Sequence, residues 1–201
     1  KDTNKLIDLA KQVGVESLVD PECDALISTG EDVSSSLLAI ALNHLGISSR
    51  SWRGWQLPIK TDSFHSNAKI EEINTKQLVE NFMKGTKVAV VSGFQGIERA
   101  GRITTLGRGG SDTSAVAIAA AINADRCDIY TDVSGIYTTD PRIKRNASKL
   151  KKISFEEMLE MASLGANVLQ TRAVELAMRN KVPITVLNSF SKEDGTLVCD
   201  E

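Results

Sequence analysis

A glycine-rich junction, residues 104–111 with the sequence TTLGRGGS, carries residue types that can bind a small anion. Residues 111–123 follow it directly and are rich in alanine, valine and isoleucine, which predicts a buried helix capped by Ser111 or Asp112. The first turn of such a helix offers free backbone N–H groups and the positive end of a dipole. Arg108 adds a planar pair of donors suited to a carboxylate or a phosphate. We therefore predict an anion site here.

Two known glycine motifs do not account for this junction. The dinucleotide pattern G-x-G-x-x-G needs a third glycine at position 112, where the chain has Asp112. The Walker pattern needs a Gly-Lys-Ser/Thr triplet, which the junction lacks. The remaining alternative to an anion site is an ordinary turn before a core helix.

Composition narrows the class of protein. A formal net charge of −2 and a pI near 5.8 argue against a partner such as nucleic acid or an anionic membrane surface. The 201 residues, 41% of them hydrophobic, are enough for one substantial core. Three widely spaced cysteines and two histidines form no metal-binding pattern, so we predict free thiols in a reducing cytoplasm, with Cys127 in the core. No signal peptide and no apolar run of about 20 residues, as a membrane span needs, is recognisable.

Helical and strand patterns alternate along the chain. Helices are predicted at residues 3–13, 32–46, 75–85, 111–123, 154–165 and 167–181, and strands within 48–59, 68–74, 87–94, 126–133 and 183–189. This alternation predicts an α/β fold with a mostly parallel sheet covered by helices on both faces. Ligands collect at the carboxyl ends of strands in such sheets, which would bring residues 92–94 and 131–133 to the site.

Five segments together resemble the catalytic domain of aspartate kinase, a member of the amino-acid kinase fold. They are VSGFQG, TTLGRGGSDTSA, NADRCDIYTDVSGIYTTDPR, SFEEMLEMASLGA and GTLV, in this order and at these spacings. The resemblance implies a three-layer α/β/α sandwich and a single catalytic domain over residues 1–201. It also implies transfer of the γ-phosphoryl group of MgATP to the side-chain carboxylate of L-aspartate, giving 4-phospho-L-aspartate. That reaction opens the biosynthesis of lysine, threonine and methionine.

The resemblance implies a role for each substrate-binding residue. Arg108 would bind the α-carboxylate of aspartate, Glu31 would receive its α-ammonium group, and Asp112 would lie close to the reacting phosphate. The other implied substrate contacts are Thr3, Gly109, Gly110 and Ser111. A zwitterion needs one cationic and one anionic anchor, which agrees with the types of Arg108 and Glu31. Taken alone, without the resemblance, Glu31 is better interpreted as an acid favoured at a helix N-terminus by the dipole.

The resemblance also implies a nucleotide site. Its residues are Tyr130, Thr131, Asp132, Ile136, Tyr137, Thr138, Thr139, Asp140, Pro141, Arg142, Ala166 and Asn167. The family usually has a lysine at the position of Asn167, so nucleotide affinity or rate would be reduced by the loss of its charge. No general base is required, because a carboxylate is already an adequate nucleophile. Magnesium is expected with the ATP, and no other metal.

Two features predict that the chain is part of a larger enzyme. Family members begin with a strand and a Lys-Phe/Tyr-Gly-Gly loop that contacts the transferring phosphate, and no such loop precedes Lys1. The chain stops where regulatory ACT domains would begin. We therefore expect an N-terminally incomplete domain with little turnover of its own, whose parent enzyme forms a dimer or pairs with a regulatory subunit. The alternatives are another phosphotransferase of this fold, acting on glutamate, carbamate or UMP, and an inactive ligand-binding fragment.

Overall fold

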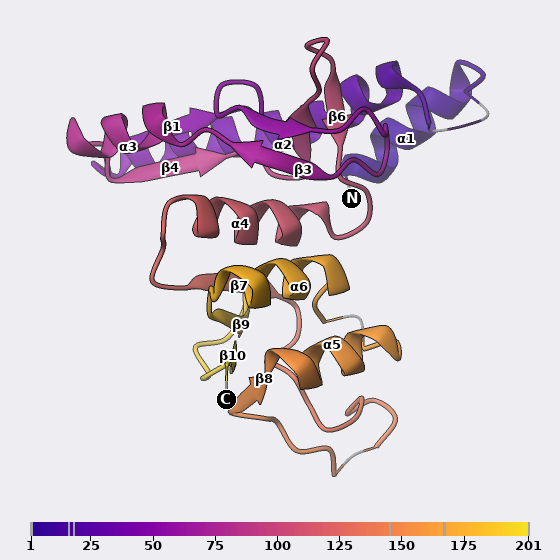
Figure 1. The fold of residues 1–201 in the computed structure, drawn as a ribbon, viewed down its shortest axis with the longest axis vertical. Coiled ribbons are helices and arrows are strands. Elements are labelled where there is room, and N and C mark those ends of the chain that lie inside the picture. Colours follow the sequence, from indigo (N-terminus) through magenta and orange to yellow (C-terminus); the bar gives the residue numbers. More distant parts are fainter. Residues whose placement is uncertain (1, 16, 18, 145, 167, 201) are drawn as a thin grey trace. The chain divides into compact units, whose positions relative to one another are not determined.

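The computed structural model describes residues 2–200 with the exception of residues 16, 18, 145 and 167 (Figure 1). The chain divides into two compact units, residues 1–114 and 115–201. Helices and strands are interspersed in both units, which confirms the predicted α/β class.

The first unit contains two sheets. Its elements are α1 (Asp2–Gln12), α2 (Pro21–His44), β1 (Ser49–Trp52), β2 (Ile59–Thr61), β3 (Ile70–Ile73), α3 (Lys76–Met83), β4 (Val88–Val91), β5 (Gln95–Ile97), β6 (Ile103–Thr105) and the start of α4 (Gly110–Ala121). Strands β1 and β4 pair in parallel, and a second sheet has the order β3-β2-β5-β6. In that sheet β2 and β5 are parallel, whereas the other two pairs are antiparallel. Helix α2 packs against β1, β4 and β6.

Helix α2 is longer than the sequence pattern predicts. It begins at Pro21 and not near Asp32, and the side chain of Asp20 caps it by accepting a hydrogen bond from the N–H of Glu22. Gly30 lies within the helix, where an added Cβ would come 3.3 Å from Leu6 of α1. The absence of a side chain at Gly30 therefore allows the two helices to approach closely.

The length of α2 has a second consequence. Over its 24 residues it is long and apolar enough to meet the length and composition criteria for a membrane-crossing helix. The same criteria admit helices of globular domains, and α2 carries Glu31 and Asp32 at its centre. Helix α2 also contacts three strands of its own unit, so it packs here as a helix of a globular unit.

Two tryptophans follow α2 in the first unit. Trp52 at the end of β1 is fully buried, with Arg50 stacked 4.0 Å from the centre of its ring. Its indole Nε1 has no hydrogen-bond partner among the described residues. Trp55, three residues later, is 49% exposed.

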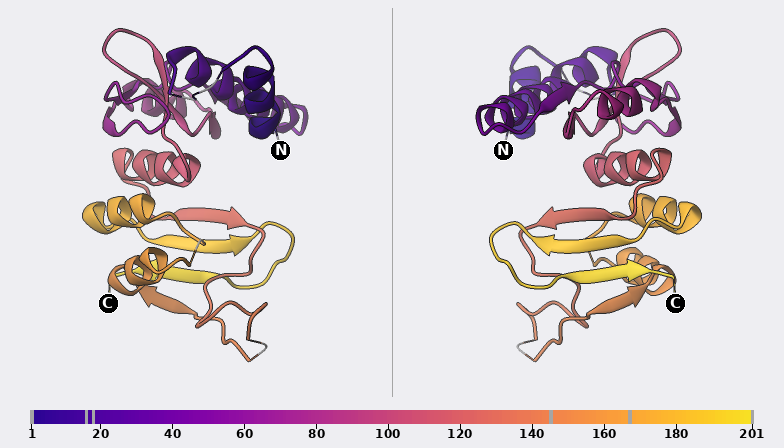
Figure 2. Two further views of the ribbon diagram at one scale, coloured as in Figure 1. Left: turned by 90° about the vertical axis from the view of Figure 1, so that its right-hand side faces the viewer. Right: turned by 90° about the vertical axis from the view of Figure 1, so that its left-hand side faces the viewer.

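The second unit is built on one mixed sheet. After the remainder of α4, its elements are β7 (Cys127–Thr131), β8 (Lys152–Ser154), α5 (Phe155–Ser163), α6 (Thr171–Asn180), β9 (Ile184–Asn188) and β10 (Thr196–Cys199). The strand order is β7-β9-β10-β8, with β9 and β10 antiparallel and the outer pairs parallel. Helices α5 and α6 cover the same face of this sheet (Figure 2). Cys127 is buried in the core between these elements, as predicted.

Several elements differ from the sequence prediction. The short strands β5, β6, β8 and β10 were not predicted, because three or four residues are too few to show a period. Helix α6 begins at Thr171 instead of residue 167. The side chain of Thr75 does not cap α3, since Asn74 accepts the hydrogen bond from the N–H of Lys76 instead.

A capping box at the start of α5 allows a stability test. The hydroxyl of Ser154 accepts from the N–H of Glu157, and the carboxylate of Glu157 accepts from the N–H of Ser154. We expect Ser154→Ala to lower the free energy of unfolding by about 1 kcal/mol in urea titrations. Ser163→Ala, at the exposed end of the same helix, serves as the control. Equal losses in the two variants would contradict this role for the capping box.

Candidate functional site

A cavity of about 530 Å³ in the first unit collects residues that are distant in sequence. It is lined by α1, by the middle of α2 and by the glycine junction before α4. All six predicted substrate contacts line it: Thr3, Glu31, Arg108, Gly109, Gly110 and Ser111. Their roles as ligand contacts remain predictions, whereas their assembly in one cavity is a property of the fold.

The backbone of the glycine junction has a conformation that larger residues would not tolerate. Gly107 and Gly109 have positive φ angles of 75° and 69°. A Cβ on Gly107 would lie 2.9 Å from the carbonyl oxygen of Ser66, and one on Gly110 would lie 2.8 Å from the ring of Phe94. Close packing against these neighbours therefore requires glycine.

Helix α4 begins one residue earlier than predicted, at Gly110. Ser111 and Asp112 lie in its first turn, so neither is the N-cap residue that the sequence suggested. The carbonyl of Gly109 accepts the backbone hydrogen bond of Thr113 and so starts the helix. Because residues 109–111 line the cavity, the positive end of the helix dipole opens onto it.

The cavity contains side chains of opposite charge. Arg108 is exposed at the junction, and Glu31 is half-buried on α2. Burial raises the pKa of the Glu31 carboxyl above its usual range, and the neighbouring charge of Asp32 raises it further. Glu31 lies in the middle of α2, so it is not the helix N-terminal acid of the alternative interpretation. A cation bound beside it would stabilise its charged form.

Phe94, one of the residues expected at the carboxyl end of a strand, lines the cavity. Its φ of 66° is unusual for a residue other than glycine. Its N–H donates to the hydroxyl of Ser114 at 3.1 Å, and its carbonyl accepts from the N–H of Leu106 at 2.9 Å. Hydrogen bonds on both sides hold this conformation in place. Asn4, Ile7, Ile27 and Ser66 also line the cavity and were not predicted, whereas Thr105 and Gly107 belong to the predicted glycine junction.

The predicted nucleotide residues from Tyr130 to Arg142 lie in the second unit, at the carboxyl end of β7 and in the loop that follows it, whereas Ala166 follows α5. Tyr130 is 64% exposed and lines a second cavity of about 560 Å³. Ile136 is only 1% exposed, and both its N–H and its carbonyl are hydrogen-bonded within the protein. Its side chain therefore supports the loop from the core. Ala166 is half-buried, and Asn167 lies outside the described residues.

The tip of that loop carries an ion pair. The guanidinium of Arg142 binds both carboxylate oxygens of Asp140, with its Nε at 3.1 and 3.2 Å. This arginine lowers the pKa of the Asp140 carboxyl. The pair is exposed to solvent, so it orients Arg142 more than it stabilises the fold.

Among the described residues, no group of three or more His, Cys, Asp or Glu side chains is arranged to hold a metal ion. His44 is exposed, and His65 forms a local hydrogen bond with Asp24.

Comparison with known proteins gives consistent matches. Residues 2–188 match the amino acid kinase family. An aspartate kinase of Stutzerimonas stutzeri is 55% identical over 98% of this chain. Among solved structures, E. coli aspartokinase III in complex with aspartate and ADP has a TM-score of 0.85 at 35% identity, over 98% of this chain. The aspartate kinase from Synechocystis has a TM-score of 0.83 at 45% identity, over the whole chain.

The matches cover only part of these proteins. The chain spans about half the length of the curated relatives it matches, 47% in the case of the S. stutzeri protein. It covers 45% of the E. coli chain and 33% of the Synechocystis chain.

Because its pKa is raised, Glu31 is predicted to lower the free energy of unfolding of the ligand-free protein at neutral pH. A carboxyl with a higher pKa in the folded state binds more protons there, so stability falls as the pH rises through the interval between the unfolded and folded values. At pH 7 we expect Glu31→Gln to raise the melting temperature by about 2 °C. The difference should shrink as the pH falls well below the unfolded value, where the carboxyl is protonated in both states.

Differential scanning calorimetry of the ligand-free protein checks this expectation. Glu175→Gln, which changes an exposed glutamate on α6, is the matched control and should show no such difference. A melting temperature of Glu31→Gln at or below that of the unmodified chain at pH 7 would contradict it.

Proposed function

We propose that this chain, which belongs to the amino acid kinase family, is the catalytic part of an aspartate kinase. It would transfer the γ-phosphoryl group of ATP to the side-chain carboxylate of L-aspartate and so serve lysine, threonine and methionine biosynthesis. The observation that carries this proposal is the single cavity lined by Arg108, Glu31 and the N-terminus of α4. The names of the relatives, and the aspartate and ADP bound by the E. coli enzyme, support it.

Aspartate would be held by its α-carboxylate and its α-ammonium group. The guanidinium of Arg108 and the N-terminus of α4 suit the α-carboxylate, because both supply donors to an anion. The carboxylate of Glu31 suits the α-ammonium group, and the hydroxyl of Thr3 adds a polar contact in the same cavity. The side-chain carboxylate of the substrate then remains free for reaction.

The proposed reaction needs positioning more than acid–base chemistry. A carboxylate is ionised at neutral pH and attacks phosphorus without a general base. Most of the acceleration would come from in-line placement and from neutralising charge on the moving phosphoryl group. Asp112, in the first turn of α4, is proposed to act beside that group. Magnesium would arrive on the phosphates of ATP, as part of the substrate.

The nucleotide is proposed to bind in the second unit. Exposed Tyr130 and the loop of residues 136–142 would surround the adenine and ribose. Asp140 would orient the guanidinium of Arg142, while Ile136 keeps the loop in position from the core. Asn167 in place of a lysine would weaken phosphate binding, because an amide keeps hydrogen bonds but has no charge.

The pairing of Glu31 with Arg108 favours an α-amino acid over carbamate or UMP, since neither of those has an ammonium group. We further propose that the enzyme works in the cytoplasm, where its three free cysteines would stay reduced. A dimer, or a complex with a regulatory subunit, is the proposed assembly.

A ligand screen tests the proposal directly. We expect isothermal titration calorimetry of the 201-residue chain to detect binding of L-aspartate and of ATP. L-glutamate and UMP are the matched competitors. Binding of glutamate or UMP in the absence of aspartate binding would overturn the proposal.

Charge reversal at the glycine junction tests the anchor. We expect Arg108→Glu to weaken aspartate binding by about 100-fold, since a charged hydrogen-bonding partner is replaced by a repelling one. Arg99→Glu, at an exposed arginine beyond β5, is the control for net charge. ATP affinity should be the same in both variants. Unaltered affinity of Arg108→Glu for aspartate would exclude Arg108 as the anchor.

A further inference from the structure

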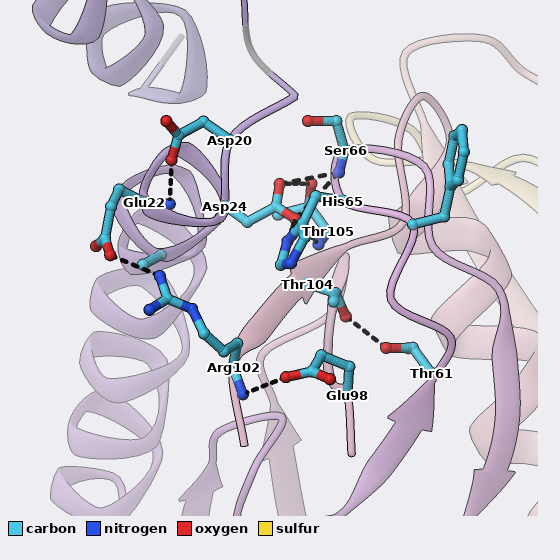
Figure 3. A network of polar contacts seen from close by, with 12 residues as sticks. Asp20, Glu22, Asp24, Thr61, His65, Ser66, Glu98, Arg102, Thr104 and Thr105 are labelled. Carbon is cyan, nitrogen blue, oxygen red and sulfur yellow. Dashed lines mark hydrogen bonds and ion pairs between the residues drawn. The ribbon is translucent and has the colours of Figure 1, made fainter. Parts of the chain in front are cut away.

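The buried carboxylate of Asp24 accepts hydrogen bonds from residues that are distant in sequence (Figure 3). Asp24, in the first turn of α2, is 0% exposed. Its oxygens accept from the backbone N–H of Thr105 at 3.0 Å, from the hydroxyl of Thr105 at 2.6 Å and from the N–H of Ser66 at 3.0 Å. The Nδ1 of His65 lies at hydrogen-bond distance from the same carboxylate, 2.8 Å away.

These hydrogen bonds join three segments that build the cavity. Thr105 is the last residue of β6, and Ser66 belongs to the loop between β2 and β3. Both line the cavity, whereas Asp24 does not. The carboxylate of Asp24 thus holds Thr105 and Ser66, two parts of the cavity wall, against α2. Helix α2 also lines the cavity.

Asp24 is also connected, along α2 and through Thr105, to both charged anchors, Glu31 and Arg108. Glu31 follows it by two helical turns on the same face of α2, and Ile27 of the cavity wall lies between them. Arg108 follows Thr105 by three residues, through a backbone turn at Gly107. The carboxylate of Asp24 therefore connects the helix that carries the anionic anchor to the strand that leads to the cationic one.

We propose that Asp24 is a positioning residue that sets the spacing between Glu31 and Arg108 and so determines affinity for the amino acid. This inference rests on the proposed function, because it assigns Asp24 to the same cavity. Burying a carboxylate is costly unless donors surround it, and here three donor groups from Thr105 and Ser66 do so. The N-terminus of α2 adds a favourable dipole.

An amide at this position would disturb the wall specifically. In Asp24→Asn one oxygen becomes an NH₂ group that faces other donors, so an N–H of Thr105 or Ser66 loses its partner. The segments would shift to restore hydrogen bonding, and the anchors would move apart or together. A small displacement is enough to weaken a ligand that must contact both.

Calorimetric titration of Asp24→Asn with L-aspartate and, separately, with a non-hydrolysable ATP analogue tests the proposal. We expect affinity for aspartate to fall by about tenfold or more, since a buried donor left without a partner has a cost of that size. Affinity for the ATP analogue should stay constant. A variant with only a general folding defect would lower both affinities together.

Thr104, the residue before Thr105, offers a matched control. The hydroxyls of Thr104 and Thr61 form a buried hydrogen bond of 2.6 Å, and neither residue lines the cavity. The double variant Thr61→Val with Thr104→Val removes this pair without leaving a buried donor unpaired. Its affinity for aspartate should match that of the unmodified chain.

The outcomes separate this inference from the proposed function. If the unmodified chain does not bind aspartate, the proposed function fails. If the unmodified chain binds aspartate and Asp24→Asn binds it equally well, the positioning role is overturned. Should Asp24→Asn not fold, as judged by circular dichroism, Thr105→Val removes one of the same hydrogen bonds. Unchanged aspartate affinity in a folded Thr105→Val would overturn the proposal, and a loss confined to aspartate would support it.

Discussion

The close packing of the glycine junction against Ser66 and Phe94 is the constraint on which the cavity depends. At Gly107 and Gly110 there is no room for a Cβ, and Gly107 and Gly109 need positive φ angles. This backbone turns the chain from the end of β6 directly into α4. The N-terminus of the helix and the side chain of Arg108 are thereby presented to one space, and any bulkier junction would separate them.

Two acids on the same face of α2 have contrasting surroundings. Glu31 is half-buried beside Asp32, and burial together with this neighbouring charge raises the pKa of its carboxyl. Asp24 is more deeply buried but is surrounded by hydrogen-bond donors. The protein itself therefore supplies partners for Asp24, in agreement with the structural role proposed for it and the ligand-binding role proposed for Glu31.

The local features of the site could be predicted from the sequence, whereas the contacts that bring distant segments together could not. The glycine junction at residues 104–111 could be predicted because glycine, arginine and a helix start lie together in the chain. Glu31 was expected from the resemblance, but its place in the middle of α2 was not, because the apolar pattern indicated a helix only from residue 32. Ile7, Ile27 and Ser66 join the cavity only through contacts between distant segments, and β5 and β6 are too short to show a period.

The tryptophans give the first unit an optical signature of its own. Trp52, sealed in the interior, and Trp55, partly open to water, both belong to residues 1–114, and the chain has no others. Indole fluorescence of this protein therefore originates entirely from the half of the chain that holds the amino-acid cavity. A shift in emission on denaturation or titration can be attributed to that half without any label.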